Sequence, residues 1–244
     1  MSAGLAAGHA PEVVFVLDGS DVCREVAAGA SLAGLPVQLL TERVAAKLTT
    51  LQTPPDVMAV FPLPTAAVPE DLRGDSQALV VYADRVADPG NMGTLVRAAA
   101  AFAAAALTSS PGSVDLFSPK VVRSGMGAVF ALPLCQDQPL YALANALGRP
   151  RVYGLVAHGG TDIRAADLRL PAVLCVGAER AGLDPKVLDH VDERLTIPLA
   201  GEGGAAIESL NAGVAGAIAL YEFSRRGAGA PRGGRRAPRT ATKE

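Results

Sequence analysis

The chain has 244 residues, half of them hydrophobic, and a formal net charge of −2. A chain of this size can bury a sizeable core, which indicates a globular protein with one or two domains rather than several. Its three cysteines, Cys23, Cys135 and Cys175, lie far apart without a CxxC pair, which argues against a disulfide framework and a structural zinc site.

The amino end gives no sign of export or membrane insertion. MSAGLAAGHA lacks the basic flank and the long apolar core of a signal peptide. No run approaches the roughly 18 apolar residues of a membrane span, and the three histidines have no metal-like spacing. We therefore expect a cytoplasmic protein in a reducing compartment, without a metal or membrane partner, and a disordered segment at residues 1–11.

Basic charge is concentrated at the carboxyl end. Residues 225–244 hold six Arg and one Lys against one Glu, a net +6, which leaves −8 for residues 1–224. This Gly, Pro and Arg-rich composition predicts a disordered tail. The tail either tethers an anionic partner such as RNA or is a solvated segment with no specific role.

Residues 12–63 alternate between strand and helix patterns. The predicted strands are 13–17, 36–40 and 57–63, and the predicted helices are 21–30 and 44–51, the latter with Val44, Leu48 and Leu51 at helical spacing. This alternation predicts a small α/β domain with a mainly parallel sheet. The Pro and Gly-containing segment 64–76 is predicted to be a linker.

A second alternation of strands and helices covers residues 77–224. The helix predicted at 92–106 has an apolar stripe of Met92, Leu95, Val96, Ala99 and Phe102. The other predicted elements are strands at 78–83, 152–157, 173–176 and 195–199, a helix at 121–130, and a final helix opened by residues 208–211. Small residues in the final helix would let it approach a neighbour closely, within the fold or across a dimer.

Two of these strands end abruptly in glycine and polar residues. Residues 173–176 lead into Gly177, and residues 195–199 lead into a Gly-rich segment at 201–206. Buried parallel strands end in this way, and ligands of open α/β sheets bind at such ends.

Asn91-Met92-Gly93-Thr94, followed by Arg97, is the first candidate constellation. An Arg at a helix start suits a phosphate or an activated hydroxyl. Helix capping by Asn91 and a solvated or salt-bridged Arg97 are the alternatives.

The segment from Gly177 to Gly182, GAERAG, is the second. A glycine directly after a buried strand allows close backbone approach to a ligand, although a tight turn between strand and helix explains it equally well. The glycines at 201–204 are a weaker phosphate-loop signal, because no Lys-Ser/Thr follows them.

Ser209 and Asn211 are the third constellation, and they either cap the last helix or face a ligand. Lys120 and Arg123, at positions i and i+3, share a helix face. They either bind RNA phosphate or belong to an ordinary charged surface.

The three constellations in this order closely resemble the three motifs of the SpoU (TrmH) family, RNA ribose 2′-O-methyltransferases of the SPOUT superfamily. The resemblance includes Ile197-Pro198-Leu199, a trailing Leu220-Tyr221-Glu222 and the middle section 111–133. It is strong over residues 77–224. Residues 12–63 look more loosely like the small ribosomal-protein-like substrate-binding domain that often precedes the catalytic domain.

This resemblance implies a trefoil-knotted α/β domain, S-adenosylmethionine as methyl donor, an RNA substrate and a homodimer. The residues that it assigns to catalysis are Asn91, Arg97, Glu179, Ser209 and Asn211. Those that it assigns to the cofactor are Gly177, Gly182, Ile197, Pro198, Leu199 and Leu210.

Four features depart from the family pattern. The segment between Leu199 and Ser209 is about four residues longer than usual, and residues 98–106 are nearly all Ala where an Asp and a Gly are common. Gly125 stands where Ser is frequent, and no basic amino-terminal helix precedes the first strand. These departures bear on substrate recognition more than on the fold.

The resemblance points to Arg97 for activation of the ribose hydroxyl. Because the pKa of Arg exceeds about 12, the substrate's own phosphate is expected to assist as base while Arg97 orients both groups. Ribosomal RNA, 23S in particular, is favoured as substrate over transfer RNA by the two-domain layout. A non-catalytic RNA-binding dimer of the same fold is the alternative from another class, and an α/β hydrolase is disfavoured because no nucleophile elbow is present.

Overall fold

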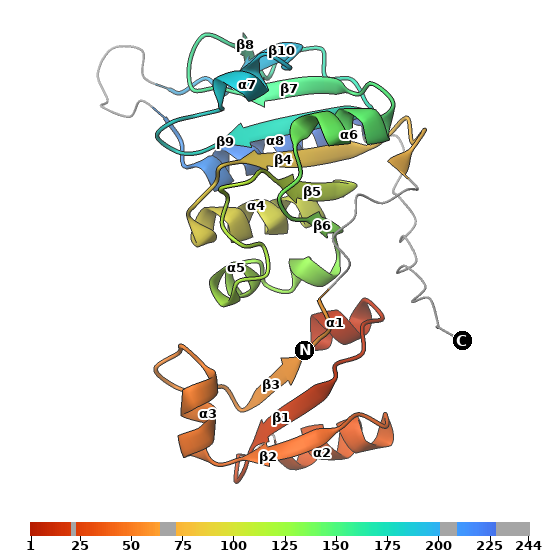
Figure 1. The fold of residues 1–244 in the computed structure, drawn as a ribbon, viewed down its shortest axis with the longest axis vertical. Coiled ribbons are helices and arrows are strands. Elements are labelled where there is room, and N and C mark those ends of the chain that lie inside the picture. The colour runs from red at the N-terminus through yellow and green to blue at the C-terminus, as the bar shows by residue number, and fades with distance from the viewer. Residues whose placement is uncertain (21–22, 64–71, 201–208, 228–244) are drawn as a thin grey trace. The chain divides into compact units, whose positions relative to one another are not determined.

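The computed structural model describes residues 1–20, 23–63, 72–200 and 209–227 (Figure 1). The chain divides into two compact units, with the boundary between Leu63 and Pro64. The Gly-rich segment 201–208 and most of the basic tail lie outside the described residues, as does the first part of the predicted linker. Residues 72–76 of that linker belong to the second unit, where Leu72 is fully buried.

The first unit is a small α/β unit. Its helices and strands are α1 (Ser2–Ala6), β1 (Val13–Leu17), α2 (Cys23–Leu32), β2 (Val37–Leu40), α3 (Glu42–Leu48) and β3 (Val57–Val60). Among the described residues they form a three-stranded sheet in the order β2-β1-β3. The prediction of a mainly parallel sheet is wrong, because β1 pairs with β2 in parallel and with β3 antiparallel.

Two further expectations for this unit need correction. Helix α1 lies in the amino end that was expected to be disordered. The apolar residues Val44 and Leu48 of α3 are exposed, and Ala45 is the residue of this helix that is buried. Helical spacing therefore identified the helix but not the face that it buries.

The second unit is an α/β domain around one parallel sheet. Its elements are β4 (Leu79–Asp84), α4 (Pro89–Ala101), β5 (Ala106–Ser109), α5 (Pro119–Ser124), η2 (Ala128–Phe130), β6 (Leu134–Cys135), α6 (Leu140–Leu147), β7 (Arg151–Leu155), β8 (Thr161–Asp162), β9 (Ala172–Gly177), α7 (Pro185–Leu188), β10 (Glu193–Thr196) and α8 (Ala212–Gly227). In the described residues the strand order is β6-β5-β4-β9-β7-β10-β8, and all neighbouring strands are parallel. The predicted α/β class is confirmed.

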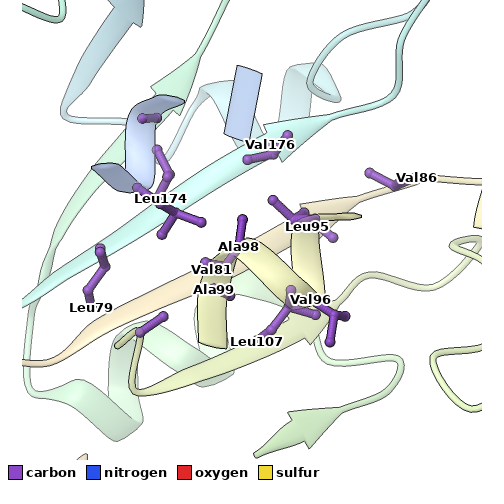
Figure 2. Packing of buried hydrophobic residues seen from close by; sticks show 14 of the residues in the cluster. Leu79, Val81, Val86, Leu95, Val96, Ala98, Ala99, Leu107, Leu174 and Val176 are labelled. Carbon is purple, nitrogen blue, oxygen red and sulfur yellow. The ribbon is translucent and has the colours of Figure 1, made fainter. Parts of the chain in front are cut away.

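Hydrophobic clusters cover both faces of this sheet. Every residue of β4 is buried, and successive side chains point to opposite faces. Leu79 and Val81 pack with residues of α4 and α8, whereas Val80 and Tyr82 pack with residues of α6 and α7. Figure 2 shows α4 side chains gathered over β4 and β9 in the first cluster. The carboxyl ends of the central strands are thereby fixed at one edge.

Helix α4 ends earlier than predicted. The Ala-rich run favours helix to residue 106, but Ala103 adopts a left-handed φ of +55° and the chain turns back to the sheet. Residues 106–109 then form β5, which pairs with β4. Alanine is small enough to be buried there, so tertiary packing overrides its helix propensity.

The remaining boundary errors are local. The predicted helix 121–130 is divided into α5 and η2 because Gly127, at φ +86°, interrupts it. Strand β10 ends at Thr196, before the predicted 199. Helix α8 begins at Ala212 and runs to Gly227, past the predicted start of the tail.

Candidate active site

A pocket opens at the carboxyl ends of β7, β9 and β10. It is open to solvent, and its empty space, including the solvent at its mouth, is about 590 Å³. Its lining residues are Leu155, Val156, Ala157, Val176, Gly177, Ala178, Glu179, Gly182, Ile197, Leu199, Ser209, Leu210, Ala212 and Ala215. Parallel strands place their carboxyl ends at one edge, which is where open α/β sheets bind ligands. The lining is mostly apolar, with the Glu179 carboxylate and the Ser209 hydroxyl as polar groups.

The turn after β9 is compact and depends on glycine. The Gly182 N–H donates to the Ala178 carbonyl at 2.8 Å, and Gly182 has a φ of +64°. A Cβ at Gly177 would lie 2.3 Å from the Gly182 carbonyl carbon, too close for any side chain. Glycine at 177 therefore allows the turn to fold back on the strand while its own backbone lines the pocket.

Three side chains from distant segments meet beside this turn. The Asn91 Nδ2 donates to Glu179 Oε1 at 2.6 Å, and the Asn211 Nδ2 donates to the same oxygen at 2.7 Å and to Asn91 Oδ1 at 2.6 Å. We call Asn91, Glu179 and Asn211 the amide–carboxylate cluster. Hydrogen bonds to a carboxylate are stronger than those between neutral groups, so the cluster joins the starts of α4 and α8 to the turn after β9.

The two asparagines differ in their relation to the helix ends. Asp88, not Asn91, caps α4, because its side chain accepts the Asn91 N–H at 2.8 Å. Asn91 lies inside the first turn with its side chain turned to Glu179. Asn211 caps α8, one of the two roles that the sequence left open, because its Oδ1 accepts the Val214 N–H at 3.1 Å. Its Nδ2 belongs to the cluster.

Close packing of α4 and α8 brings these asparagines together. A Cβ at Gly213 would lie 2.9 Å from the Thr94 Cβ, and one at Gly216 would lie 2.4 Å from a methyl carbon of Leu95. The small residues of α8 thus permit a close approach within the fold, one of the two possibilities that the sequence left open.

The structure leaves Arg97 outside the pocket of its own chain. Arg97 is exposed and is not a lining residue. The exposed positions of α4 are Thr94, Arg97 and Ala101, so Arg97 lies on the outward face of the helix. Within one chain, Arg97 therefore does not line the pocket with Gly177 and Leu210.

The other predicted site residues divide into two groups. Gly182, Ile197, Leu199, Ser209 and Leu210 line the pocket with Gly177. Pro198 is exposed and does not line it, and Lys120 and Arg123 lie on the exposed surface of α5, also outside the lining.

Sequence reasoning missed the end of β7. Leu155, Val156 and Ala157 form part of the pocket wall. The strand was predicted at 152–157, and the His158-Gly159-Gly160 that follows it is a polar and glycine ending like those of the other two strands, but it was not counted among the candidate constellations. Its place beside β9 and β10 in the sheet was the missing information.

A buried carboxylate, also missed, supports the far end of the turn. Asp84 is only 2% exposed, and its Oδ2 accepts the Asp184 N–H at 2.7 Å. Burial, and next to it the charge of Asp84, raises the pKa of Tyr82 to about 12 and also raises the pKa of the Cys175 thiol. Both groups therefore stay protonated at neutral pH, and neither is a candidate nucleophile.

Two features are absent from the described ranges. These ranges contain no helix with the length and apolar character needed to cross a membrane. They also contain no group of three or more His, Cys, Asp or Glu side chains placed to hold a metal ion.

Comparison with known proteins gives a consistent result. Residues 78–221 match the model of the SpoU rRNA Methylase family. The chain is 32% identical over 191 residues to 23S rRNA (guanosine(2553)-2′-O)-methyltransferase RlmP of Bacillus subtilis, covering 78% of this chain and 73% of the relative. It is 33% identical over 186 residues to 23S rRNA (uridine(2479)-2′-O)-methyltransferase of Streptomyces viridochromogenes, covering 71% of this chain and 61% of the relative.

The fold is similar to that of a solved structure over nearly the whole chain. The SpoU methyltransferase AviRb from Streptomyces viridochromogenes, in complex with the cofactor AdoMet, superposes with a TM-score of 0.77 at 28% identity. The match covers 92% of this chain and 86% of AviRb.

Proposed function

The chain belongs to the SpoU rRNA methylase family, and we propose that it transfers the methyl group of S-adenosylmethionine to a ribose 2′-hydroxyl of 23S ribosomal RNA. The observation that carries this proposal is the pocket at the ends of β7, β9 and β10. The segments around Gly177, Ile197 and Leu210, which resemble the family's cofactor motifs, line it together. Two relatives are named as 23S rRNA 2′-O-methyltransferases, and AviRb was solved with AdoMet.

The lining of the pocket fits S-adenosylmethionine in chemistry. It is mostly apolar with a few polar groups, which is usual for small-ligand sites. The apolar wall suits the adenine ring and the methionine chain, and Gly177 leaves backbone exposed to the ligand. The bound cofactor supplies an electrophilic methyl group, so the protein has to orient the ribose hydroxyl and help to remove its proton.

The amide–carboxylate cluster is suited to orientation. Its three side chains hold one another through hydrogen bonds of 2.6–2.7 Å, so their positions are set before substrate arrives. Ser209 lines the pocket, so its hydroxyl is available to a bound ribose. We assign the cluster to holding the pocket mouth in shape and Ser209 to positioning the sugar.

Arg97 enters this scheme through a homodimer. The outward face of α8 exposes Val214 and Tyr221, and Tyr221 contacts Phe102 ring edge to face at a centroid distance of 5.9 Å. Exposed apolar groups of this kind are typical of interfaces. Arg97 lies on the outward face of the neighbouring α4. In a dimer formed through this face, Arg97 of one copy would approach the pocket of the other copy. There Arg97 orients the ribose and its phosphate.

The strand order supports the trefoil knot that the family resemblance implies. Strands β7 and β8 are joined by residues 156–160, yet β10 lies between them in the sheet. The chain leaving β10 therefore passes the connection from β7 to β8 before it reaches α8. We assign the knot to this crossing.

The substrate proposal extends to the first unit and the surface of α5. The likeness to RlmP covers 191 residues, whereas the methylase match covers 144. The likeness to RlmP therefore extends beyond the part of the chain that the methylase family model matches. We assign RNA binding to the first unit and to Lys120 and Arg123. The 23S rRNA relatives favour ribosomal over transfer RNA, and ribosomal RNA implies a cytoplasmic location.

Replacement of Arg97 tests this function. Arg97→Ala should abolish methyl transfer and leave the dissociation constant of S-adenosylmethionine unchanged, because Arg97 does not line the pocket of its own chain. Arg149→Ala is a matched control, since Arg149 is exposed beyond α6 on the other face of the sheet. Unchanged turnover in Arg97→Ala would remove Arg97 from the mechanism.

The alternative of a non-catalytic RNA-binding dimer makes a different prediction. It requires no cofactor, whereas the assembled amide–carboxylate cluster and the open pocket favour the enzyme. Calorimetry decides between them: absence of binding at millimolar S-adenosylmethionine would favour the non-enzyme.

A further inference from the structure

Thr196, the last residue of β10, contacts both ends of the connection between β7 and β8. Its Oγ1 donates to the Val156 carbonyl at 3.2 Å and accepts the Gly160 N–H at 3.0 Å. Val156 and Gly160 begin and end the connection that crosses β10. The Thr196 hydroxyl therefore holds both ends of this connection against β10.

The main chain alone holds the connection less completely. The Val156 N–H donates to the Leu195 carbonyl at 2.9 Å, and the Ile163 N–H donates to the Thr196 carbonyl at 3.0 Å. Between these bonds, the Thr196 hydroxyl is the hydrogen-bond partner of both the Val156 carbonyl and the Gly160 N–H within the described part of the chain. Loss of the hydroxyl would leave one donor and one acceptor in a partly buried position.

The fit around this hydroxyl is close. A Cβ at Gly160 would lie 2.8 Å from Thr196 Oγ1 and 2.8 Å from the Arg194 carbonyl oxygen. Glycine at 160 thus allows the connection to lie directly on β10. The contact is specific to this pair of segments and is not a general consequence of parallel pairing.

The same two segments form neighbouring walls of the pocket. Val156 and Ala157, at the start of the connection, line it from one side. Ile197 and Leu199, which directly follow Thr196, line it from another. Thr196 itself does not line the pocket, so any effect on a ligand passes through these residues.

We propose that Thr196 is a positioning residue for the cofactor pocket. Its hydroxyl fixes the position of Val156 and Ala157 relative to Ile197 and Leu199. This inference rests on the proposed function, in which the pocket binds S-adenosylmethionine. Without the hydroxyl, the two walls have to be ordered when the cofactor binds, which we expect to raise the dissociation constant about five- to tenfold. The effect falls on cofactor affinity, because the amide–carboxylate cluster and Arg97 are left in place.

The test compares Thr196→Val, which keeps the shape and removes the hydroxyl, with Thr196→Ser, which keeps the hydroxyl. Thr108→Val is the matched control, because Thr108 is a buried strand threonine in β5 whose hydroxyl donates to the Val81 carbonyl at 3.4 Å, away from the pocket. Calorimetry gives the dissociation constant of S-adenosylmethionine, and methyl transfer gives KM and kcat. Thr196→Val should raise both the dissociation constant and the KM for S-adenosylmethionine about five- to tenfold and leave kcat at saturating cofactor unchanged. Thr196→Ser and Thr108→Val should bind like the wild type.

Three results would overturn the inference: wild-type affinity in Thr196→Val, equal loss in Thr196→Ser, or a fall in kcat without a change in KM. Failure of the wild type itself to bind S-adenosylmethionine would overturn the proposed function and this inference together, so the two failures are distinguishable. If Thr196→Val does not fold, amide hydrogen exchange of the wild type decides. The Gly160 amide should be protected in the cofactor-free protein, and rapid exchange there would contradict the role of Thr196.

Discussion

Replacement of Gly177 by Ala perturbs the pocket at its most crowded backbone position. The new Cβ would lie 2.3 Å from the Gly182 carbonyl carbon and 2.5 Å from the Leu183 nitrogen. All of the atoms that it meets are backbone, so no flexible side chain can move aside. The turn from Ala178 to Gly182 has to open, and the pocket wall opens with it.

The size of the effect follows from these contacts. Overpacking of this kind costs about 1–3 kcal/mol of unfolding free energy. In a unit of roughly 150 residues, each kcal/mol lowers the melting temperature by about 2–4 °C. The protein should therefore stay folded at 25 °C, while its affinity for S-adenosylmethionine falls by more than about tenfold, which corresponds to 1.4 kcal/mol.

Thermal unfolding and calorimetry with S-adenosylmethionine measure the two quantities, and Gly148→Ala separates them. Gly148 ends α6 at φ +69° with nothing within 4 Å of an added Cβ, so Ala there strains only the backbone, by about 1–2 kcal/mol. The control should lose stability and keep full cofactor affinity. Wild-type affinity in Gly177→Ala, or equal losses in both variants, would refute the assignment of Gly177 to the cofactor pocket.

Three further predictions test other parts of the structure. Asn211→Asp keeps an acceptor for the helix cap, but it loses the amide donor of the cluster and places a second carboxylate beside Glu179. Methyl transfer should fall strongly and the melting temperature should fall by a few degrees, and unimpaired transfer would contradict the role of the cluster. Tyr221→Glu places a charge on the outward face of α8 and should give a monomer in analytical ultracentrifugation. This monomer should bind the cofactor but not transfer the methyl group, and an active dimer would place the interface elsewhere. Burial raises the pKa of Cys135 to about 11 and also raises the pKa of Cys175. At pH 8, only the half-buried Cys23 should therefore react quickly with a thiol reagent. Rapid reaction of all three cysteines in the native protein would contradict the described core.

The same raised thiol pKa sets a pH dependence of stability. The unfolded chain releases the Cys135 proton near the ordinary pKa of 9.0, whereas the folded protein retains it until about 11. Between these values the unfolded state binds fewer protons than the native state, so the unfolding free energy contributed by this group falls as pH rises.

The residues after the buried strands could be located from the sequence. Gly177 and Glu179 follow one apolar run, and Ile197 and Leu199 belong to the end of another. Because the carboxyl ends of parallel strands meet at one edge, the prediction that both runs line one pocket needed only the strand direction. The pocket lining agrees with it.

Order within the sheet could not be predicted in this way. Periodicity identifies a strand but not its neighbours, so nothing in the residues indicated that β10 lies between β7 and β8. That order brings Val156 to the pocket and Thr196 to the connection between β7 and β8, and neither contribution could be assigned from the sequence. The knot entered only through the resemblance to the SpoU family.

Local propensity misled where tertiary packing opposed it. The alanines after Val96 predict a longer helix, but Ala103 turns the chain and Ala106 pairs in β5. Asn91 looks like a helix cap, yet Asp88 caps α4 and frees the Asn91 side chain for Glu179. Both outcomes depend on contacts between segments far apart in the chain.

Methyl transfer to ribosomal RNA tests the function of the strand-end pocket most directly. The wild-type protein is incubated with labelled S-adenosylmethionine and 23S rRNA that lacks the modification, and the labelled nucleotide is mapped by its resistance to alkaline hydrolysis, which requires a free 2′-hydroxyl. We predict label on a single ribose, lost in Arg97→Ala and reduced in Gly177→Ala when the cofactor is below saturation. Label on a base, or no transfer by a wild-type protein that binds the cofactor, would contradict it.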